Sequence, residues 1–118
     1  MITGKQVRMA GFIHNKKRDI SEFVLLSDNE VVRVGDASVQ IVSASGHTPG
    51  SAMFTIDDTI LIGGDTISIR SNNEIGCFSI VQNMNHKKNV ELVEKLNNEH
   101  FFAKFSIIAS GHYGVLVR

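Results

Sequence analysis

Short apolar runs rich in Val and Ile, separated by glycine or polar turns, dominate the chain. They predict strands over residues 23–27, 31–34, 38–43, 52–56, 59–63 and 105–109, with a weaker signal over residues 7–13. The polar segment Asp28-Asn29-Glu30 lies between the first two runs, so we expect those runs to form a hairpin. The run over residues 59–63 is apolar without alternation, which favours a strand covered on both faces.

One helix is predicted over residues 86–98. Asn85 precedes it and can accept a hydrogen bond from the first turn, as N-cap residues do. An apolar stripe along one side consists of Leu92, Val93 and Leu96. Residues 76–81 fit either a short strand or an irregular segment. The order of the elements predicts an α/β fold whose sheet has at least one covering helix.

Three side chains that can bind metals each follow an apolar run. His47 lies in Gly46-His47-Thr48-Pro49-Gly50-Ser51, Asp65 follows Gly63-Gly64, and His112 follows Ser110-Gly111. Strands of one sheet that end on the same side bring such residues to a common edge. Two imidazoles and one carboxylate suit zinc, iron or manganese better than a thiolate site would.

Each of these residues also has a simpler interpretation when taken alone. His47 would be a polar loop residue, and Asp65 would cap a helix or a turn. Pro49 keeps Thr48 out of helical geometry, so His47 is expected in a fixed, extended loop. The occurrence of all three motifs together favours the metal site.

The three motifs, over about residues 25–112, resemble those of metallo-β-lactamase-fold hydrolases such as glyoxalase II, lactonases and β-lactamases. The resemblance implies that His47 binds a first metal ion, that Asp65 bridges two ions, and that His112 binds the second. It also implies half of an αββα sandwich, with a mixed or antiparallel sheet and at least one covering helix.

The family's first motif, His-x-His-x-Asp-His, has no counterpart in this sequence. The remaining histidines, His14, His86 and His100, do not have its spacing. Without that motif each ion keeps only two ligands from this chain, whereas a catalytic zinc normally has three. We therefore expect zinc, with iron or manganese as alternatives, to bind weakly and substoichiometrically to this chain alone.

The missing motif indicates that residues 1–118 form a single truncated domain that lacks the first half of the fold. One sheet face would then be uncovered, so we expect a homo-oligomer or an assembly with a complementary N-terminal half. If completed by such a partner, the resemblance implies metal-dependent hydrolysis of an ester, thioester, lactone or amide. The alternative is a non-catalytic remnant or interaction module with the same fold. No catalytic residue or substrate is indicated.

Composition narrows these functions further. The 118 residues include 12 Lys and Arg and 12 Asp and Glu, so the chain lacks the excess of positive charge that is typical of nucleic-acid-binding proteins. The short basic cluster over residues 14–18 is expected to be a solvated loop. Cys77 is the only cysteine, which excludes an internal disulfide. Neither a signal peptide nor an apolar run long enough for a membrane is evident, so we expect a cytoplasmic protein.

Overall fold

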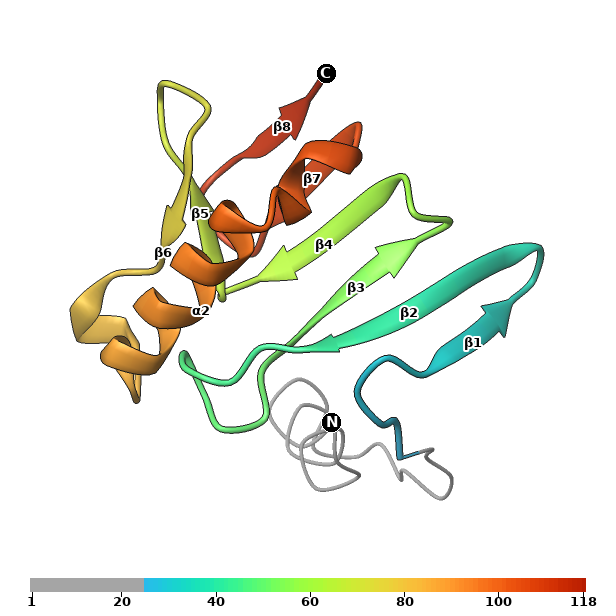
Figure 1. The fold of residues 1–118 in the computed structure, drawn as a ribbon, viewed down its shortest axis with the longest axis horizontal. Helices are drawn as coiled ribbons and strands as arrows, with labels where there is room; N and C mark the ends of the chain where they lie inside the picture. The colour runs from blue at the N-terminus through green and yellow to red at the C-terminus, as the bar shows by residue number, and fades with distance from the viewer. Residues whose placement is uncertain (1–24) are drawn as a thin grey trace, which may run out of the picture.

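The computed structural model describes residues 25–118 (Figure 1), so the strand signal over residues 7–13, the basic cluster and His14 lie outside the described residues. The main element is a six-stranded mixed sheet of order β1-β2-β3-β4-β7-β8. Its strands are β1 (Val31–Val34), β2 (Ala37–Ser43), β3 (Ala52–Ile56), β4 (Ile60–Gly64), β7 (Ile107–Ser110) and β8 (Val115–Val117). The predicted α/β fold with a mixed sheet is confirmed.

The remaining elements lie beyond one end of this sheet and along one of its faces. They are a second, antiparallel pair of strands, β5 (Ile67–Ile69) and β6 (Ile75–Cys77), two short 3-10 helices, η1 (Ile80–Gln82) and η2 (Phe101–Lys104), and the helix α2 (His86–Asn98). The predicted helix is confirmed, and the Asn85 side chain accepts a hydrogen bond from the backbone N–H of Lys88 at 3.1 Å. Over residues 25–118, no helix is long and apolar enough to cross a membrane.

The first predicted hairpin forms its turn, but its two predicted strands do not pair over the described residues, and residues 23 and 24 lie outside them. β1 pairs with β2, with Val31 opposite Gln40, and Gly35 at φ +61° helps the chain turn between them. The predicted turn does form: the N–H of Glu30 donates to the carbonyl of Ser27 at 3.1 Å, and Asn29 has a φ of 64°. Beyond the turn the chain runs beside β2, where the N–H of Ile41 donates to the carbonyl of Glu30 at 3.0 Å. Of the expected first strand, the described part contains only an isolated bridge at Leu26.

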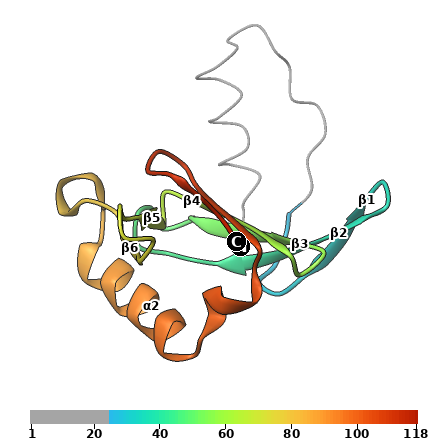
Figure 2. The same ribbon diagram turned by 90° about the horizontal axis from the view of Figure 1, so that it is seen from above.

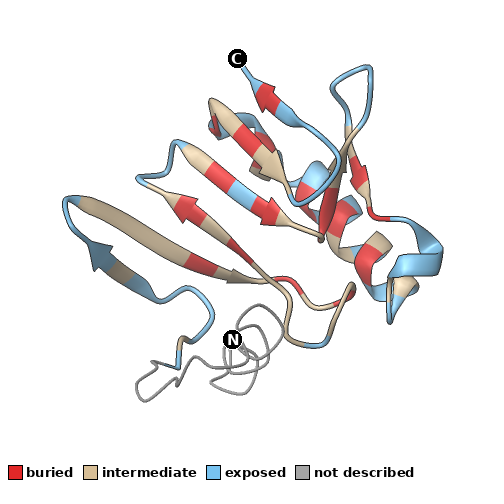
Figure 3. Cartoon of the chain, turned by 180° about the vertical axis from the view of Figure 1, so that it is seen from behind, coloured by how far each residue is buried: buried red, intermediate tan, exposed pale blue. Residues whose placement is uncertain are grey.

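The core lies between the sheet and α2 (Figure 2). Met53, Leu61 and Ile108 point from the sheet toward Val93 and Leu96 of the helix, and all five are buried. Phe102, Phe105 and Leu116 extend the same cluster. In β3 and β4 every second position is buried, as expected when one face of a sheet is packed (Figure 3). Ile41, the one buried residue of β2, lies on the opposite face.

The opposite face of the sheet is apolar across five strands. We call this the outer face. The strand register aligns its side chains in two rows that cross the sheet. The first row is Ile41, Phe54, Ile62, Ala109 and Val115. The second row is Val39, Ile56, Ile60, Ile107 and Val117. Three of these residues remain exposed: Ile62 at 39%, Val115 at 62% and Val117 at 70%.

The expectation that residues 59–63 form a strand covered on both faces is therefore wrong for the described part of the chain. α2 packs against Leu61, whereas the next residue, Ile62, points to the outer face and is exposed. No other α-helix occurs within residues 25–118. The unbroken apolar pattern of β4 thus marks a second face that can be buried.

Candidate metal centre

The strand directions bring the three candidate ligands to one edge of the sheet. β2 and β4 are both antiparallel to β3, and β7 is parallel to β4, so these three strands run in the same direction. Their carboxyl ends meet at one edge. His47, Asp65 and His112 each follow one of these ends.

Asp65 lies between the two imidazoles. Its Oδ2 atom is 3.3 Å from Nε2 of His47, and its Oδ1 atom is 2.8 Å from Nδ1 of His112. The side chains of His47 and Asp65 are 19% and 29% exposed, whereas that of His112 is 66% exposed. The sequence-based prediction that these three side chains lie together is confirmed, and the His112 side of the cluster faces solvent.

Two of the motif glycines are required by close approaches around the cluster. A Cβ atom on Gly111 would lie 2.2 Å from Oδ1 of Asp65, and the N–H of Gly111 donates to the carbonyl of Gly64 at 2.8 Å. A Cβ atom on Gly46 would lie 2.8 Å from the backbone of Asn89 in α2. Glycine therefore lets the His47 loop reach the helix and lets the His112 loop reach Asp65.

Substitution of Gly111 by alanine is expected to rotate the Asp65 carboxylate away from His112, because the new methyl group would occupy the position of Oδ1. Zinc affinity, measured by calorimetric titration, should fall about tenfold or more. Asp36→Ala is the control, since Asp36 lies in the turn between β1 and β2, at the end of β2 opposite the His47 loop. Unchanged zinc affinity in Gly111→Ala would contradict this role of the glycine.

The loop that carries His47 is held by its own hydrogen bonds. The backbone N–H of Thr48 donates to Oγ of Ser51 at 3.0 Å, and the N–H of Ala44 donates to the Ser51 carbonyl at 2.8 Å. Phe78, which is buried, packs against the ring of His47 with centroids 5.0 Å apart. The imidazole is therefore fixed on both sides, by its loop and by an aromatic ring.

Several residues around the cluster could not be found from the sequence. Phe78 also contacts the rings of His112 and Tyr113, at centroid distances of 6.0 and 5.2 Å. Oδ1 of Asn83 lies 3.0 Å from Nδ1 of His47, a contact between positions 36 residues apart. Neither residue belongs to a recognisable motif, so only the tertiary structure identifies them.

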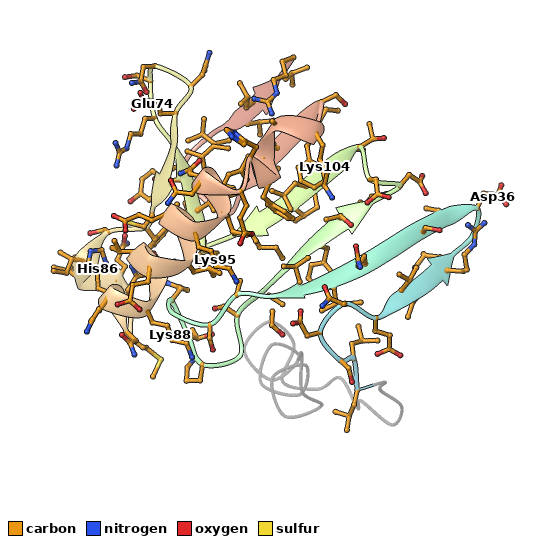
Figure 4. The ribbon with its side chains drawn as sticks, viewed as in Figure 1. Asp36, Glu74, His86, Lys88, Lys95 and Lys104 are labelled. Atoms are coloured by element: carbon orange, nitrogen blue, oxygen red, sulfur yellow. The ribbon has the colours of Figure 1, made fainter. Side chains whose placement is uncertain are left out.

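The other described histidines lie outside the cluster. His86 begins α2 (Figure 4), and its Nδ1 atom is 2.9 Å from the side-chain nitrogen of Asn83. His100 is exposed and follows α2 in a left-handed conformation, with φ of 58°. Neither makes a described contact with Asp65.

Imidazole and carboxylate are suitable ligands for zinc, iron or manganese, but the cluster has fewer ligands per ion than a catalytic zinc site normally has. Each imidazole contacts a different oxygen of Asp65. Among residues 25–118, no group of three or more His, Cys, Asp or Glu side chains is arranged to hold a metal ion. The described residues thus offer one imidazole and one carboxylate oxygen on each side of Asp65.

No protein-family model matches the sequence, and no curated protein matches it. Solved structures do resemble it. One is an archaeal metallo-β-lactamase superfamily protein from Sulfolobus tokodaii, with 13% identity and a TM-score of 0.60 over 98% of this chain and 48% of that chain. A metallo-β-lactamase family protein from Thermus thermophilus has 16% identity and a TM-score of 0.58 over 96% of this chain and 40% of that one.

A metallo-β-lactamase from Pontibacter korlensis has 14% identity and a TM-score of 0.60 over 98% of this chain and 51% of that one. The chain spans about half the length of these structural relatives. At such low identity the likeness concerns the fold. The mixed six-stranded sheet, the small second sheet and the single α-helix among the described residues correspond to half of a metallo-β-lactamase sandwich, so this chain has the metallo-β-lactamase fold.

Proposed function

We propose that this chain supplies one half of a metal-dependent hydrolase site, with His47, Asp65 and His112 as metal ligands. The observation that carries the proposal is the position of Asp65, whose two carboxylate oxygens each face one imidazole. A carboxylate placed in this way can bridge two ions. Further ligands must then come from another polypeptide segment, because two donors per ion are fewer than a catalytic zinc normally has.

A bound zinc, iron or manganese ion would polarise a substrate carbonyl and lower the pKa of a bound water. The residues of this chain hold the ligands in place. His47 is fixed by its loop and Phe78, whereas His112 and Tyr113 lie on the exposed side, where a substrate can approach. By analogy with the fold family, the substrate is an ester, thioester, lactone or amide.

The same proposal assigns a role to the outer face. Its two rows carry only apolar side chains, and leaving such a surface in water costs roughly 25 cal/mol per Å². A second apolar sheet is the surface that best matches it. We propose that the isolated chain forms a homo-oligomer through this face, and that a complementary half can occupy the same face.

A cytoplasmic location of the chain stays a prediction.

Hydrolysis by the assembled chain tests the proposed function. The oligomeric fraction, supplied with zinc, iron(II) or manganese(II), is assayed against chromogenic esters, thioesters, lactones and amides. We expect metal-dependent hydrolysis of one class, abolished by a chelator and absent in Asp65→Ala. An assembly that binds metal through Asp65 and hydrolyses none of these substrates would instead favour the non-catalytic interaction module.

A further inference from the structure

Two asparagine side chains link the candidate ligand His47 to the backbone beside Asp65. The first, Asn89 in α2, is fully buried. Its Oδ1 atom accepts from the backbone N–H of Phe78 at 3.3 Å, and its Nδ2 atom donates to the carbonyl of Thr66 at 2.9 Å. A backbone N–H can only donate and a carbonyl can only accept, so these two partners fix which end of the amide is oxygen.

The orientation of Asn89 fixes that of Asn83. The Nδ2 atom of Asn83 donates to Oδ1 of Asn89 at 3.1 Å and to the carbonyl of Phe78 at 3.3 Å. Both partners are acceptors, so this end of the Asn83 amide must be the nitrogen. Its Oδ1 atom consequently faces Nδ1 of His47, at 3.0 Å, and can only accept a hydrogen bond from it.

From this chain of bonds we propose that Asn83, oriented by Asn89, is a positioning residue that holds the proton of neutral His47 on Nδ1. Nε2 of His47 then carries a free electron pair directed at the Asp65 carboxylate, 3.3 Å away. Two electron-rich groups facing each other at this distance form a place for a cation. The purpose of this arrangement rests on the proposed function, because a metal ion binds the unprotonated nitrogen of an imidazole.

We call the hydrogen-bonded pair Asn83 and Asn89 the asparagine relay. Backbone hydrogen bonds fix the positions of its two ends. The N–H of Asn85 donates to the Gly46 carbonyl at 2.8 Å, and that of Met84 donates to the His47 carbonyl at 3.0 Å. The other end is the carbonyl of Thr66, the residue that directly follows Asp65. The relay therefore connects the backbone of one candidate ligand to that of the other through α2.

The same geometry assigns the opposite tautomer to His86. Its Nδ1 atom faces Nδ2 of Asn83 at 2.9 Å. The two hydrogens of this amide nitrogen are shared among three acceptors, Nδ1 of His86, Oδ1 of Asn89 and the Phe78 carbonyl, and since Nδ2 cannot accept, the proton of neutral His86 lies on Nε2. His47 and His86 thus contact opposite ends of one amide and should differ in the nitrogen that carries the proton. This difference gives an internal comparison within a single protein.

Long-range ¹⁵N–¹H correlation spectra of the metal-free, ¹⁵N-labelled chain, recorded at a pH where the imidazoles are neutral, test the proposal. We expect the proton on Nδ1 of His47 and on Nε2 of His86. In Asn83→Leu, which has no acceptor, the His47 proton should move to Nε2, and zinc affinity should fall about 10- to 100-fold.

Asn97→Leu is the matched control. The side-chain amide of Asn97, also in α2, donates to the carbonyl of Ile75 at 3.1 Å and has no described contact with His47. It should leave both tautomers unchanged. A wild-type spectrum with the His47 proton on Nε2 would overturn the proposal, even if the Asn83→Leu variant fails to fold. The expected tautomers without zinc binding would leave the relay standing and remove the proposed function.

Discussion

Replacement of Ile62 by lysine is expected to convert an associated chain into a monomer. Ile62 lies in the middle of the outer face, between Phe54 and Ala109 in the cross-strand row, and is 39% exposed. A charge there would be buried without a partner at any interface formed by this face. Obligate interfaces of this kind bury roughly 2,000 Å² or more in total. Light scattering after size exclusion, at low micromolar concentration, measures the change in mass.

The matched control is Val81→Lys. Val81 is 88% exposed in η1, outside the outer face, so the same new charge there should leave the mass unchanged. Two results would contradict the assignment of the outer face as an interface. One is a wild-type chain that is a stable monomer and binds no hydrophobic dye, and the other is an Ile62→Lys variant that keeps the wild-type mass.

Zinc binding by the isolated chain is expected to be weak, with less than one ion per chain, and to disappear in Asp65→Ala. The reason is the number of donors: each side of Asp65 offers one imidazole and one carboxylate oxygen. Removal of the carboxylate leaves two imidazoles with no metal-binding group between them. Calorimetric titration gives both the affinity and the stoichiometry.

Asp36→Ala serves as the control for this titration, since Asp36 lies in the turn between β1 and β2, at the end of β2 opposite the His47 loop (Figure 4). It should bind zinc as the wild type does. Tight binding of two ions per chain, lost in Asp65→Ala, would show that ligands beyond His47, Asp65 and His112 complete the site. Equal binding by Asp65→Ala and wild type would place the zinc elsewhere.

The position of the cluster could be predicted because it depends on local signals and strand direction. Asn85 caps α2 through bonds within one turn, and the helix has the predicted bounds. His47, Asp65 and His112 each follow an apolar run, and the three runs became strands with one direction. Since side chains beyond the carboxyl ends of such strands share an edge, the sequence was sufficient to bring them together.

The errors and omissions concern choices between competing long-range contacts. The segment Asp28-Asn29-Glu30 turns the chain as predicted, yet β1 after it pairs with β2 and not with the residues before the turn. The strand β8 went unpredicted, because its signal is only three residues long, Val115–Val117. The asparagine relay was also missed, since Asn83 and His47 meet only through the packing of α2 against the loop.

The central claim is that His47, Asp65 and His112 bind the metal, and the imidazole ¹⁵N signals during a zinc titration test it most directly. His100 acts as the internal reference, because it follows α2 and has no described contact with Asp65 or with Asn83. Zinc should shift the nitrogen signals of His47 and His112, and both shifts should vanish in Asp65→Ala. Shifts confined to His86 or His100, or shifts of His47 and His112 that persist in Asp65→Ala, would contradict the claim.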